Sequence, residues 1–157
     1  MKRRTFILSG ILSGTSLLAG RAALSAGSDF EITRTDAEWR AMLSEAEYAV
    51  MRDEKTERAG SSPLDLEKRA GVFACRGCDL PLYDASTKFD SGTGWPSFYA
   101  SLPNAVETKD DNSLFAKRTE VHCRRCGSHL GHIFDDGPKP TGKRHCLNGV
   151  SLTFTAA

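Results

Sequence analysis

The residues in this chain most able to do chemistry are its five cysteines, and their spacing divides them into two groups. Four of them form two CxxC pairs, Cys75-x-x-Cys78 and Cys123-x-x-Cys126, and 44 residues separate the pairs. Each pair can present two sulfurs on one side of a tight turn, and two such turns complete a tetrahedron of thiolates around zinc. Because such a closed site is structural, the pattern predicts one structural Zn²⁺. Nothing in the sequence calls for an organic cofactor.

Two disulfides are the alternative use of these four cysteines, because the N-terminus predicts export to an oxidising compartment. The expected mode of export favours zinc. A chain that leaves the cytoplasm already folded would bind zinc in reducing surroundings, and its thiolates would already be capped when it arrived. We therefore predict that Cys75, Cys78, Cys123 and Cys126 are metal ligands.

The fifth cysteine, Cys146, has no partner in this pattern and follows Lys143, Arg144 and His145. Neighbouring positive charge favours a thiolate and lowers a cysteine pKa from its usual ~8.5. In an extended strand, Cys146 would share one face with Arg144 and Asn148. The pattern predicts a reactive cysteine. The alternatives are that Cys146 is an inert buried side chain and that Arg144 is a solvated surface cation.

Two histidines, His129 and His132, stand close together in GSHLGHIF. Imidazole side chains can donate a proton to a substrate oxygen or orient a water molecule. Taken singly, each could be an ordinary packed histidine. The cluster of cation, cysteine and asparagine around Cys146 is what favours the chemical interpretation.

The elements that must position these residues change in character along the chain. Capping boxes at 35–38 and 44–47 predict two short helices in succession. From Gly71 onward, short β-type runs alternate with turn residues: GVFAC, SLFAKR, TEVHC, HLGHIF and VSLTF. The last run predicts Val150, Leu152 and Phe154 inward and Ser151 and Thr153 outward. We expect a small, mainly β, antiparallel domain with a helical N-terminal cover.

The first 26 residues have the layout of an export signal. A basic patch that includes Arg3 and Arg4 precedes a short, broken apolar run, and small residues follow from Ala22. The paired arginines resemble the twin-arginine signal, which exports folded proteins. We predict a signal over 1–26, an enzyme domain over 27–157 and a periplasmic location. The alternative is an uncleaved amphipathic tail or membrane anchor.

Charge excludes some partners. Of 21 basic and 20 acidic side chains, residues 1–26 carry four basic and no acidic ones, so the remaining 17 basic and 20 acidic side chains give a net charge of −3. A mildly acidic body does not favour nucleic acid or an anionic membrane as partner. We expect no stable membrane insertion after signal cleavage, and a monomer by default.

The motifs FDSGTGWPSF, RTEVHC, CGSHLGHIFDDGP and PTGKRHCLNGVSL, together with both CxxC pairs, closely resemble those of the type-B methionine sulfoxide reductases. The resemblance runs from about residue 36 to 155. It implies a zinc-bearing β fold of two antiparallel sheets. It also implies reduction of the R epimer of methionine sulfoxide, mostly in peptides and proteins.

The resemblance also implies roles for single residues. Cys146 matches the nucleophile, and His129 and His132 match the pair that binds and protonates the sulfoxide oxygen. Trp95 matches the aromatic wall that holds the substrate's methyl group, although without the motif it could be plain core. The other implied site residues are Arg144 and Asn148, which flank the nucleophile, and Phe134, which is assigned with Trp95 to substrate binding.

One position departs from the family pattern. Many members have a second, resolving cysteine two residues before the tryptophan, and here that position is Thr93. A hydroxyl cannot form a disulfide, so we expect regeneration by an external reductant, either a thioredoxin-like protein or a small thiol. Two other functions compete with the reductase: a non-enzymatic zinc-ribbon binding module, and a thiol peroxidase or redox sensor that uses Cys146.

Overall fold

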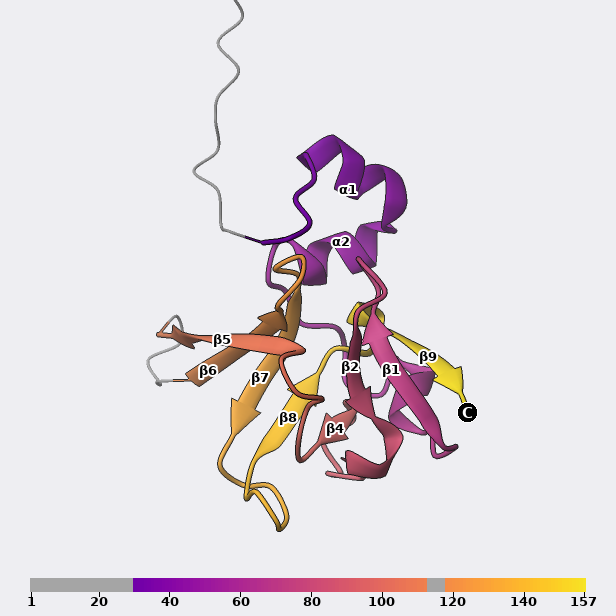
Figure 1. Ribbon diagram of the computed structural model, residues 1–157, viewed down its shortest axis with the longest axis vertical. Coiled ribbons are helices and arrows are strands. Elements are labelled where there is room, and N and C mark those ends of the chain that lie inside the picture. Colours follow the sequence, from indigo (N-terminus) through magenta and orange to yellow (C-terminus); the bar gives the residue numbers. More distant parts are fainter. Residues whose placement is uncertain (1–29, 113–117) are drawn as a thin grey trace, which may run out of the picture.

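The computed structural model describes residues 30–112 and 118–157 (Figure 1). The predicted export signal lies outside these residues, as does almost all of the SLFAKR run. Within the described part, no helix is long and apolar enough to cross a membrane.

Two short helices, α1 (Asp36–Met42) and α2 (Glu45–Met51), open the described chain. Both predicted capping boxes are confirmed. At α1, the Thr35 hydroxyl accepts from the Glu38 amide at 3.3 Å, and the Glu38 carboxylate accepts from the Thr35 amide at 2.7 Å. Ser44 and Glu47 repeat the arrangement at α2. These reciprocal bonds satisfy amide groups that a helix start leaves without partners, which explains how two seven-residue helices follow one another.

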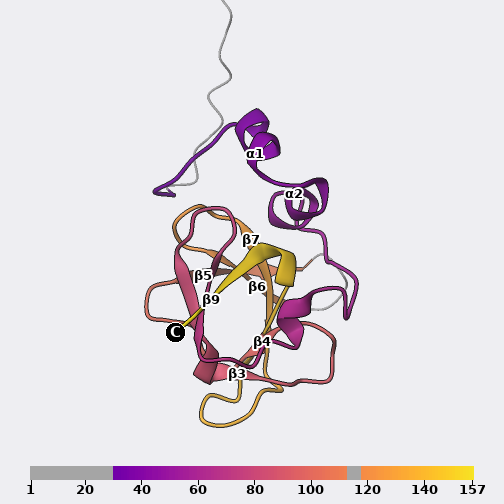
Figure 2. The ribbon, with the colours of Figure 1, turned by 90° about the vertical axis from the view of Figure 1, so that its right-hand side faces the viewer.

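The rest of the described chain forms two antiparallel sheets, which confirms the expected fold class (Figures 1 and 2). The smaller sheet has the order β2-β1-β9 and the larger has the order β3-β4-β8-β7-β6-β5. The strands are β1 (Gly71–Cys75), β2 (Pro81–Asp84), β3 (Lys88–Phe89), β4 (Ser97–Phe98), β5 (Val106–Asp111), β6 (Arg118–Cys123), β7 (His129–Phe134), β8 (Arg144–Leu147) and β9 (Leu152–Ala156). Three short 3-10 turns complete the elements: η1 (Pro63–Asp65), η2 (Ala85–Thr87) and η3 (Gly149–Ser151).

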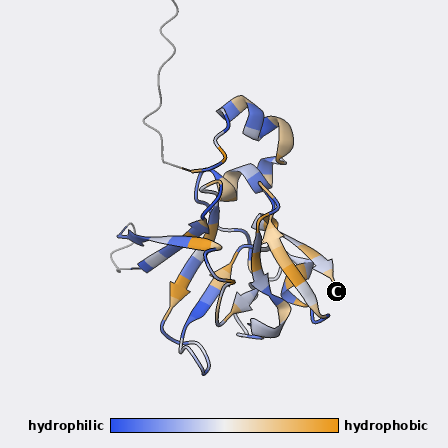
Figure 3. Cartoon of the chain, in the orientation of Figure 1, coloured by the Kyte–Doolittle hydropathy of each residue, from blue (hydrophilic) through white to orange (hydrophobic). Residues whose placement is uncertain are grey.

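Aromatic side chains join the two sheets in the core. Phe73 of β1 and Tyr83 of β2 contact Phe98 of β4, with ring centroids 5.0 Å and 4.6 Å apart. All three rings are fully buried, so each contributes roughly 1.5–3 kcal/mol of transfer free energy. Figure 3 shows the contrast that follows from this packing, since β1 is largely hydrophobic and β6 mostly hydrophilic.

A bulge in β7 changes which side chains share a face. In the pairing of β6 with β7, Val121 lies opposite Gly131, but the next residue, His122, lies opposite His129. Leu130 is therefore the extra residue. In a regular strand, residues 129 and 132 would point to opposite faces, and one extra residue restores them to the same face.

The start of β9 differs from the sequence prediction. Residues 149–151 form η3 rather than strand, and Ser151 is fully buried while Val150 is partly exposed. The Ser151 hydroxyl donates to the backbone carbonyl of His129 at 3.1 Å, which explains why a polar side chain is inside. The predicted alternation therefore holds only from Leu152 onward.

Candidate metal centre and active site

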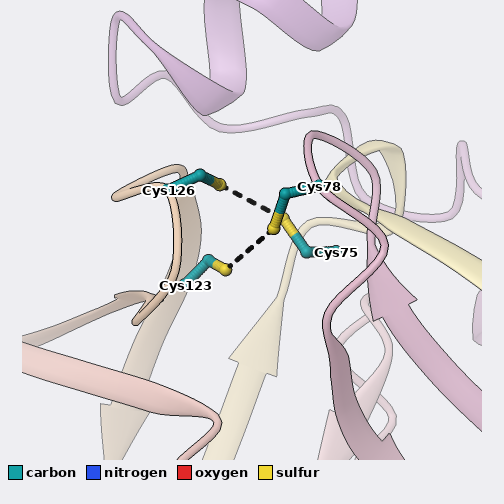
Figure 4. A group of neighbouring side chains, drawn as sticks. All are labelled: Cys75, Cys78, Cys123 and Cys126. Atoms are coloured by element: carbon teal, nitrogen blue, oxygen red, sulfur yellow. Dashed lines mark hydrogen bonds between the residues drawn. The ribbon is translucent and has the colours of Figure 1, made fainter. Parts of the chain in front are cut away.

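The four paired cysteines meet at one point between the sheets. Cys75 ends β1 and Cys78 lies in the turn that follows, and in the same way Cys123 ends β6 and Cys126 lies in the turn before β7 (Figure 4). All four sulfurs lie within 4.8 Å of one another. The Sγ atoms of Cys75 and Cys126 are 3.7 Å apart, and those of Cys78 and Cys123 are 3.5 Å apart.

These distances fit a metal and exclude disulfides. Four sulfurs placed tetrahedrally at about 2.3 Å from zinc lie about 3.8 Å from one another, whereas a disulfide requires about 2.05 Å. All five cysteines are free. The cluster is therefore positioned to hold one metal ion, and its all-sulfur donor set fits a structural zinc.

Both turns use a left-handed residue directly after the second cysteine. Gly127 takes this position with φ of 66° and Asp79 takes it with φ of 56°. Gly77 has a different reason for being glycine. A Cβ there would approach Met51, Ser128 and Trp39 to 3.1 Å each, so the residue leaves room for α1 and α2 to pack on the metal site.

A separate cavity of about 200 Å³ surrounds Cys146. It brings together Trp95, His132, Phe134 and Asn148 from the predicted site. It is lined by Thr56, Trp95, Arg118, Gly131, His132, Phe134, Cys146, Leu147 and Asn148. His129 and Arg144 are not among the lining residues, although each contacts one that is.

Strand register explains why His132 and Ser97 flank the cysteine. Cys146 of β8 pairs with His132 of β7 on one side and with Ser97 of β4 on the other. Directly opposed residues of antiparallel strands have Cβ atoms about 4.5–5.5 Å apart on the same face. Gly131 permits this approach, because any Cβ there would collide with the carbonyl oxygen of Cys146.

The expected lowering of the Cys146 pKa is wrong. Burial raises the pKa of this thiol, and the nearby Arg144 together with hydrogen bonds from Thr93, Arg144 and Ser97 lowers it by less. Arg144 is also committed elsewhere, since its guanidinium binds both oxygens of Asp136 at 2.9 Å. The sequence pattern correctly located a cation near the sulfur but contained no information on how deeply the sulfur lies.

Arg144 is not a solvated surface cation. Only 11% of its side chain is exposed, and its guanidinium lies 4.5 Å from the centroid of the Phe134 ring. The two hydrogen bonds to the Asp136 carboxylate and the cation–π contact with the Phe134 ring hold the guanidinium in one orientation. Arg144 thus contacts Phe134, a wall of the cavity, without lining the cavity itself.

His132 is held by an acidic partner that the sequence did not reveal. Its Nε2 lies 2.8 Å from Oδ2 of Asp111, and the same oxygen accepts from Arg118 at 2.5 Å. Burial lowers the pKa of His132, and the hydrogen bond to Asp111 only partly offsets this. The imidazole is therefore mostly neutral at neutral pH.

His129 is buried beside His132 rather than exposed in the cavity. Its ring is 2% exposed and meets the His132 ring edge-on at 5.5 Å. Its Nδ1 lies 2.7 Å from Glu120, while its buried Nε2 has no hydrogen-bond partner among the described atoms. Glu120 also bonds His122 at 2.8 Å. Burial opposes the charge of Glu120, but these two hydrogen bonds prevail and lower its pKa to about 2.

Trp95 and Asn148 both line the cavity and are both held in place by hydrogen bonds. The Trp95 Nε1 donates to the backbone carbonyl of Glu57 at 3.2 Å. The Asn148 amide accepts from the Glu57 backbone amide at 3.0 Å and donates to the Leu130 carbonyl at 3.1 Å. Sequence reasoning missed Glu57, which belongs to none of the motifs described above.

Thr93 also lies at the site. Its hydroxyl hydrogen-bonds Cys146, and Ser91 connects it to Ser97 through contacts of 2.8 Å. The position at which the family resemblance led us to expect a resolving cysteine is therefore occupied by one of three linked hydroxyls beside the sulfur. The other four cysteines all belong to the metal cluster.

A partly buried cysteine lies opposite a histidine in an aromatic-walled cavity, and the same domain carries a sulfur-only metal centre. Together these features define a class of protein: cysteine-dependent redox enzymes with a structural metal. Comparison with known proteins identifies the family within this class. Residues 43–156 match the model of the SelR domain. The peptide methionine sulfoxide reductase of Methanosarcina mazei is 48% identical over 126 residues, covering 80% of this chain and 90% of the relative.

Two further relatives agree. The peptide methionine sulfoxide reductase of Pseudomonas putida is 52% identical, covering 79% of this chain and 94% of its own. The chloroplastic peptide methionine sulfoxide reductase B1 of Arabidopsis thaliana is 52% identical, and the alignment covers 76% of this chain and 59% of the relative. Among solved structures, the Mis18 Yippee-like domain aligns at 16% identity over 57% of this chain and 98% of its own, with a TM-score of 0.47, and no argument rests on it.

The chain belongs to the type-B peptide methionine sulfoxide reductases, as its motifs predicted. It is an oxidoreductase that reduces the R epimer of methionine sulfoxide in peptides. This activity requires oxidised peptides or proteins as substrates and a thiol as reductant. The enzymatic interpretation is accordingly favoured over a zinc-ribbon binding module.

Proposed function

We propose that Cys146 is the nucleophile of this reductase and that it works without an internal resolving cysteine. The Cys146 sulfur attacks the sulfoxide sulfur, the S–O bond of the substrate breaks, and the oxygen ends on Cys146. Methionine leaves and a cysteine sulfenic acid remains, so the substrate is reduced by two electrons and Cys146 is oxidised by two. The observation that carries this proposal is the pairing of Cys146 with His132 inside the cavity walled by Trp95.

The protonation states at this site support the chemistry with a Cys146 thiol in place of the expected thiolate. A raised Cys146 pKa and a lowered His132 pKa place the proton on sulfur at neutral pH. A thiol beside a neutral imidazole holds the same single proton as a thiolate beside an imidazolium. As the sulfoxide oxygen gains charge, His132 relays that proton from sulfur to oxygen.

The remaining residues are assigned by their positions. Trp95 and Phe134 form the apolar walls against which the substrate's methyl group packs. Asn148 completes the cavity beside the sulfur, and Arg144 orients Phe134 and tunes the thiol. His129, buried and bound to Glu120, acts through its contact with His132.

Regeneration uses an external thiol. A first thiol attacks the sulfenic acid of Cys146, which releases water and forms a mixed disulfide. A second thiol attacks that disulfide and restores the Cys146 thiol. The support is the placement of sulfur: Thr93 is next to Cys146, and the other four cysteines belong to the metal cluster.

The proposal includes export. The twin-arginine-type layout of residues 1–26 supports delivery of the folded, zinc-loaded monomer to the periplasm. N-terminal sequencing of protein recovered from the exported fraction tests this. A mature form that still begins at Met1 would overturn the assignment of a cleaved signal.

The first test of the chemistry is an assay with dithiothreitol on separated R and S epimers of a methionine sulfoxide peptide. We expect turnover of the R epimer alone, and no turnover by Cys146→Ser. Mass spectrometry after one turnover, without reductant, should find a sulfenic acid on Cys146. A disulfide between Cys146 and any of the other four cysteines would contradict the one-cysteine cycle.

A further inference from the structure

The segment between α2 and β1 contacts two parts of the candidate site that lie far away in sequence. Residues 57–62 meet the loop that carries Trp95 on one side and η3, which begins three residues after Cys146, on the other. Gly60 donates its amide to the Gly94 carbonyl at 2.7 Å. Ser62 packs so closely on Gly149 that a Cβ at that glycine would overlap its hydroxyl.

Glu57 makes the most direct of these contacts with its backbone. Its carbonyl accepts from Trp95 Nε1 at 3.2 Å, and its amide donates to Asn148 Oδ1 at 3.0 Å. One residue therefore touches both the aromatic wall and the asparagine of the cavity, from positions 38 and 91 residues away in sequence.

The Glu57 side chain anchors that backbone. Its carboxylate accepts from the amide of Gly149 and, at 3.3 Å, from that of Val150. These are the first amides of η3, and Asn148, at the N-cap position, makes no side-chain cap bond. Glu57 supplies the missing cap from a distant part of the chain. The Asn148 amide is thereby left to bond the Glu57 amide and the Leu130 carbonyl.

We propose that Glu57 is a positioning residue of this reductase, which holds Trp95 and Asn148 in their places beside Cys146 through its carboxylate bonds to η3. This rests on the roles proposed above for Trp95 and Asn148. Glu57 does not line the cavity and takes no part in the chemistry. Its loss should loosen the substrate wall and leave the thiol itself unchanged, because Cys146 is surrounded by Ser97, His132, Thr93 and Arg144.

The test compares Glu57→Ala and Glu57→Gln with matched changes at Glu54. Glu54 lies three residues earlier on the same segment and makes an exposed ion pair with Lys109. We expect Glu57→Ala to raise KM for an R-sulfoxide peptide about 10-fold, the scale of one lost hydrogen bond to a charged group. Glu57→Gln keeps one acceptor oxygen and should give a smaller rise. The Glu54 variants should match the wild type.

Two readouts separate positioning from general stability. The rate at which iodoacetamide alkylates Cys146 should be unchanged in every variant. Acrylamide quenching of tryptophan fluorescence should increase in Glu57→Ala, and it reports Trp95 because Trp39 is 2% exposed. If Glu57→Ala does not fold, Glu57→Gln decides, since it preserves length and one hydrogen bond.

An equal KM and equal quenching in the Glu57 and Glu54 variants would overturn the proposal. A general loss of stability that speeds alkylation of Cys146 and lowers turnover together would also overturn it. A different result is expected if Glu57 positions Trp95 but Trp95 has no role in substrate binding. In that case Trp95→Ala leaves KM unchanged, while Glu57→Ala still increases acrylamide quenching relative to the Glu54 variants.

Discussion

At the scale of single residues, the chemistry depends on where protons sit around Cys146. Burial outweighs the nearby guanidinium, so the sulfur is a thiol at rest and His132 is neutral. The Cys146 thiol therefore already holds the proton that the sulfoxide oxygen needs. A basic triplet in the sequence indicates nearby charge, but the balance between charge and burial depends on the tertiary structure.

Replacing Arg144 should raise the Cys146 pKa further, because the guanidinium lowers it in the native protein. Iodoacetamide reacts with the thiolate, so the pH dependence of the alkylation rate reports the Cys146 pKa. In the wild type, the midpoint of this pH profile should lie above the usual cysteine pKa of about 8.5. In Arg144→Ala the midpoint should move to still higher pH. Lys143→Ala, which removes an exposed cation paired with Asp135, serves as control. A wild-type midpoint below 8.5 would contradict the argument.

The two tryptophans should respond to substitution in opposite ways. Trp95→Ala removes a cavity wall and should raise KM and reduce turnover of the peptide, with little change in the free energy of unfolding. Trp39→Ala removes a buried ring held between Arg34 and Arg52 and should cost about 3–5 kcal/mol of stability. Urea unfolding and peptide turnover distinguish the two. Unimpaired turnover in Trp95→Ala would remove this residue from the substrate site.

At the scale of elements, the bulge at Leu130 assembles the two histidines. The HxxH spacing in a regular strand places the rings on opposite faces, and the extra residue brings His129 onto the face of His132. The CxxC turns, capping boxes and strands around β1, β6 and β7 were predictable because their signals lie within a few residues. The bulge, the short strand β4 and the polar strand β5 were not, because pairing with distant strands determines them.

Glu120 stabilises this arrangement by bonding two histidines across β6 and β7. Glu120→Gln should lower the free energy of unfolding by about 1–3 kcal/mol at pH 7, since it weakens two hydrogen bonds to a buried carboxylate. The Glu120 pKa is lowered from 4.5 to about 2, so its contribution is complete above about pH 4.5 and a measurement at pH 7 records all of it.

Glu107→Gln is the matched control for this prediction. Glu107 is 54% exposed and lies 3.7 Å from His122, so its loss should change stability by less than about 0.5 kcal/mol. If Glu120→Gln and Glu107→Gln changed the free energy of unfolding equally, the buried position of Glu120 would not strengthen its hydrogen bonds to the histidines.

At the scale of the whole molecule, the cysteine cluster joins the two sheets at the end covered by α1 and α2 (Figure 1). The CxxC pairs predicted this junction from sequence, and the resemblance to the family predicted most of the cavity. Neither indicated Glu57, Asp111 or Glu120, because a lone carboxylate in a polar segment looks the same whether it faces water or a distant backbone amide. Only the folded chain identifies its partner.

Removal of the metal should unfold the domain, because four clustered thiols would lose the ion that ties β1–β2 to β6–β7. We expect about one zinc per chain by metal analysis of the purified protein. Chelation under reducing conditions should abolish the cooperative thermal transition, and added zinc should restore it. An unchanged transition after complete metal loss would show that the aromatic contacts between the sheets are sufficient.

The hydroxyl of Thr93 beside Cys146 has a kinetic consequence. In the proposed one-cysteine cycle, each oxidised enzyme molecule would have to wait for a collision with a thiol from solution. Peptide and thiol would then obey ping-pong kinetics, and the apparent kcat would rise with thiol concentration until that second encounter is no longer limiting. The turnover of the enzyme would therefore measure the reducing capacity of its compartment as much as the amount of damaged methionine there.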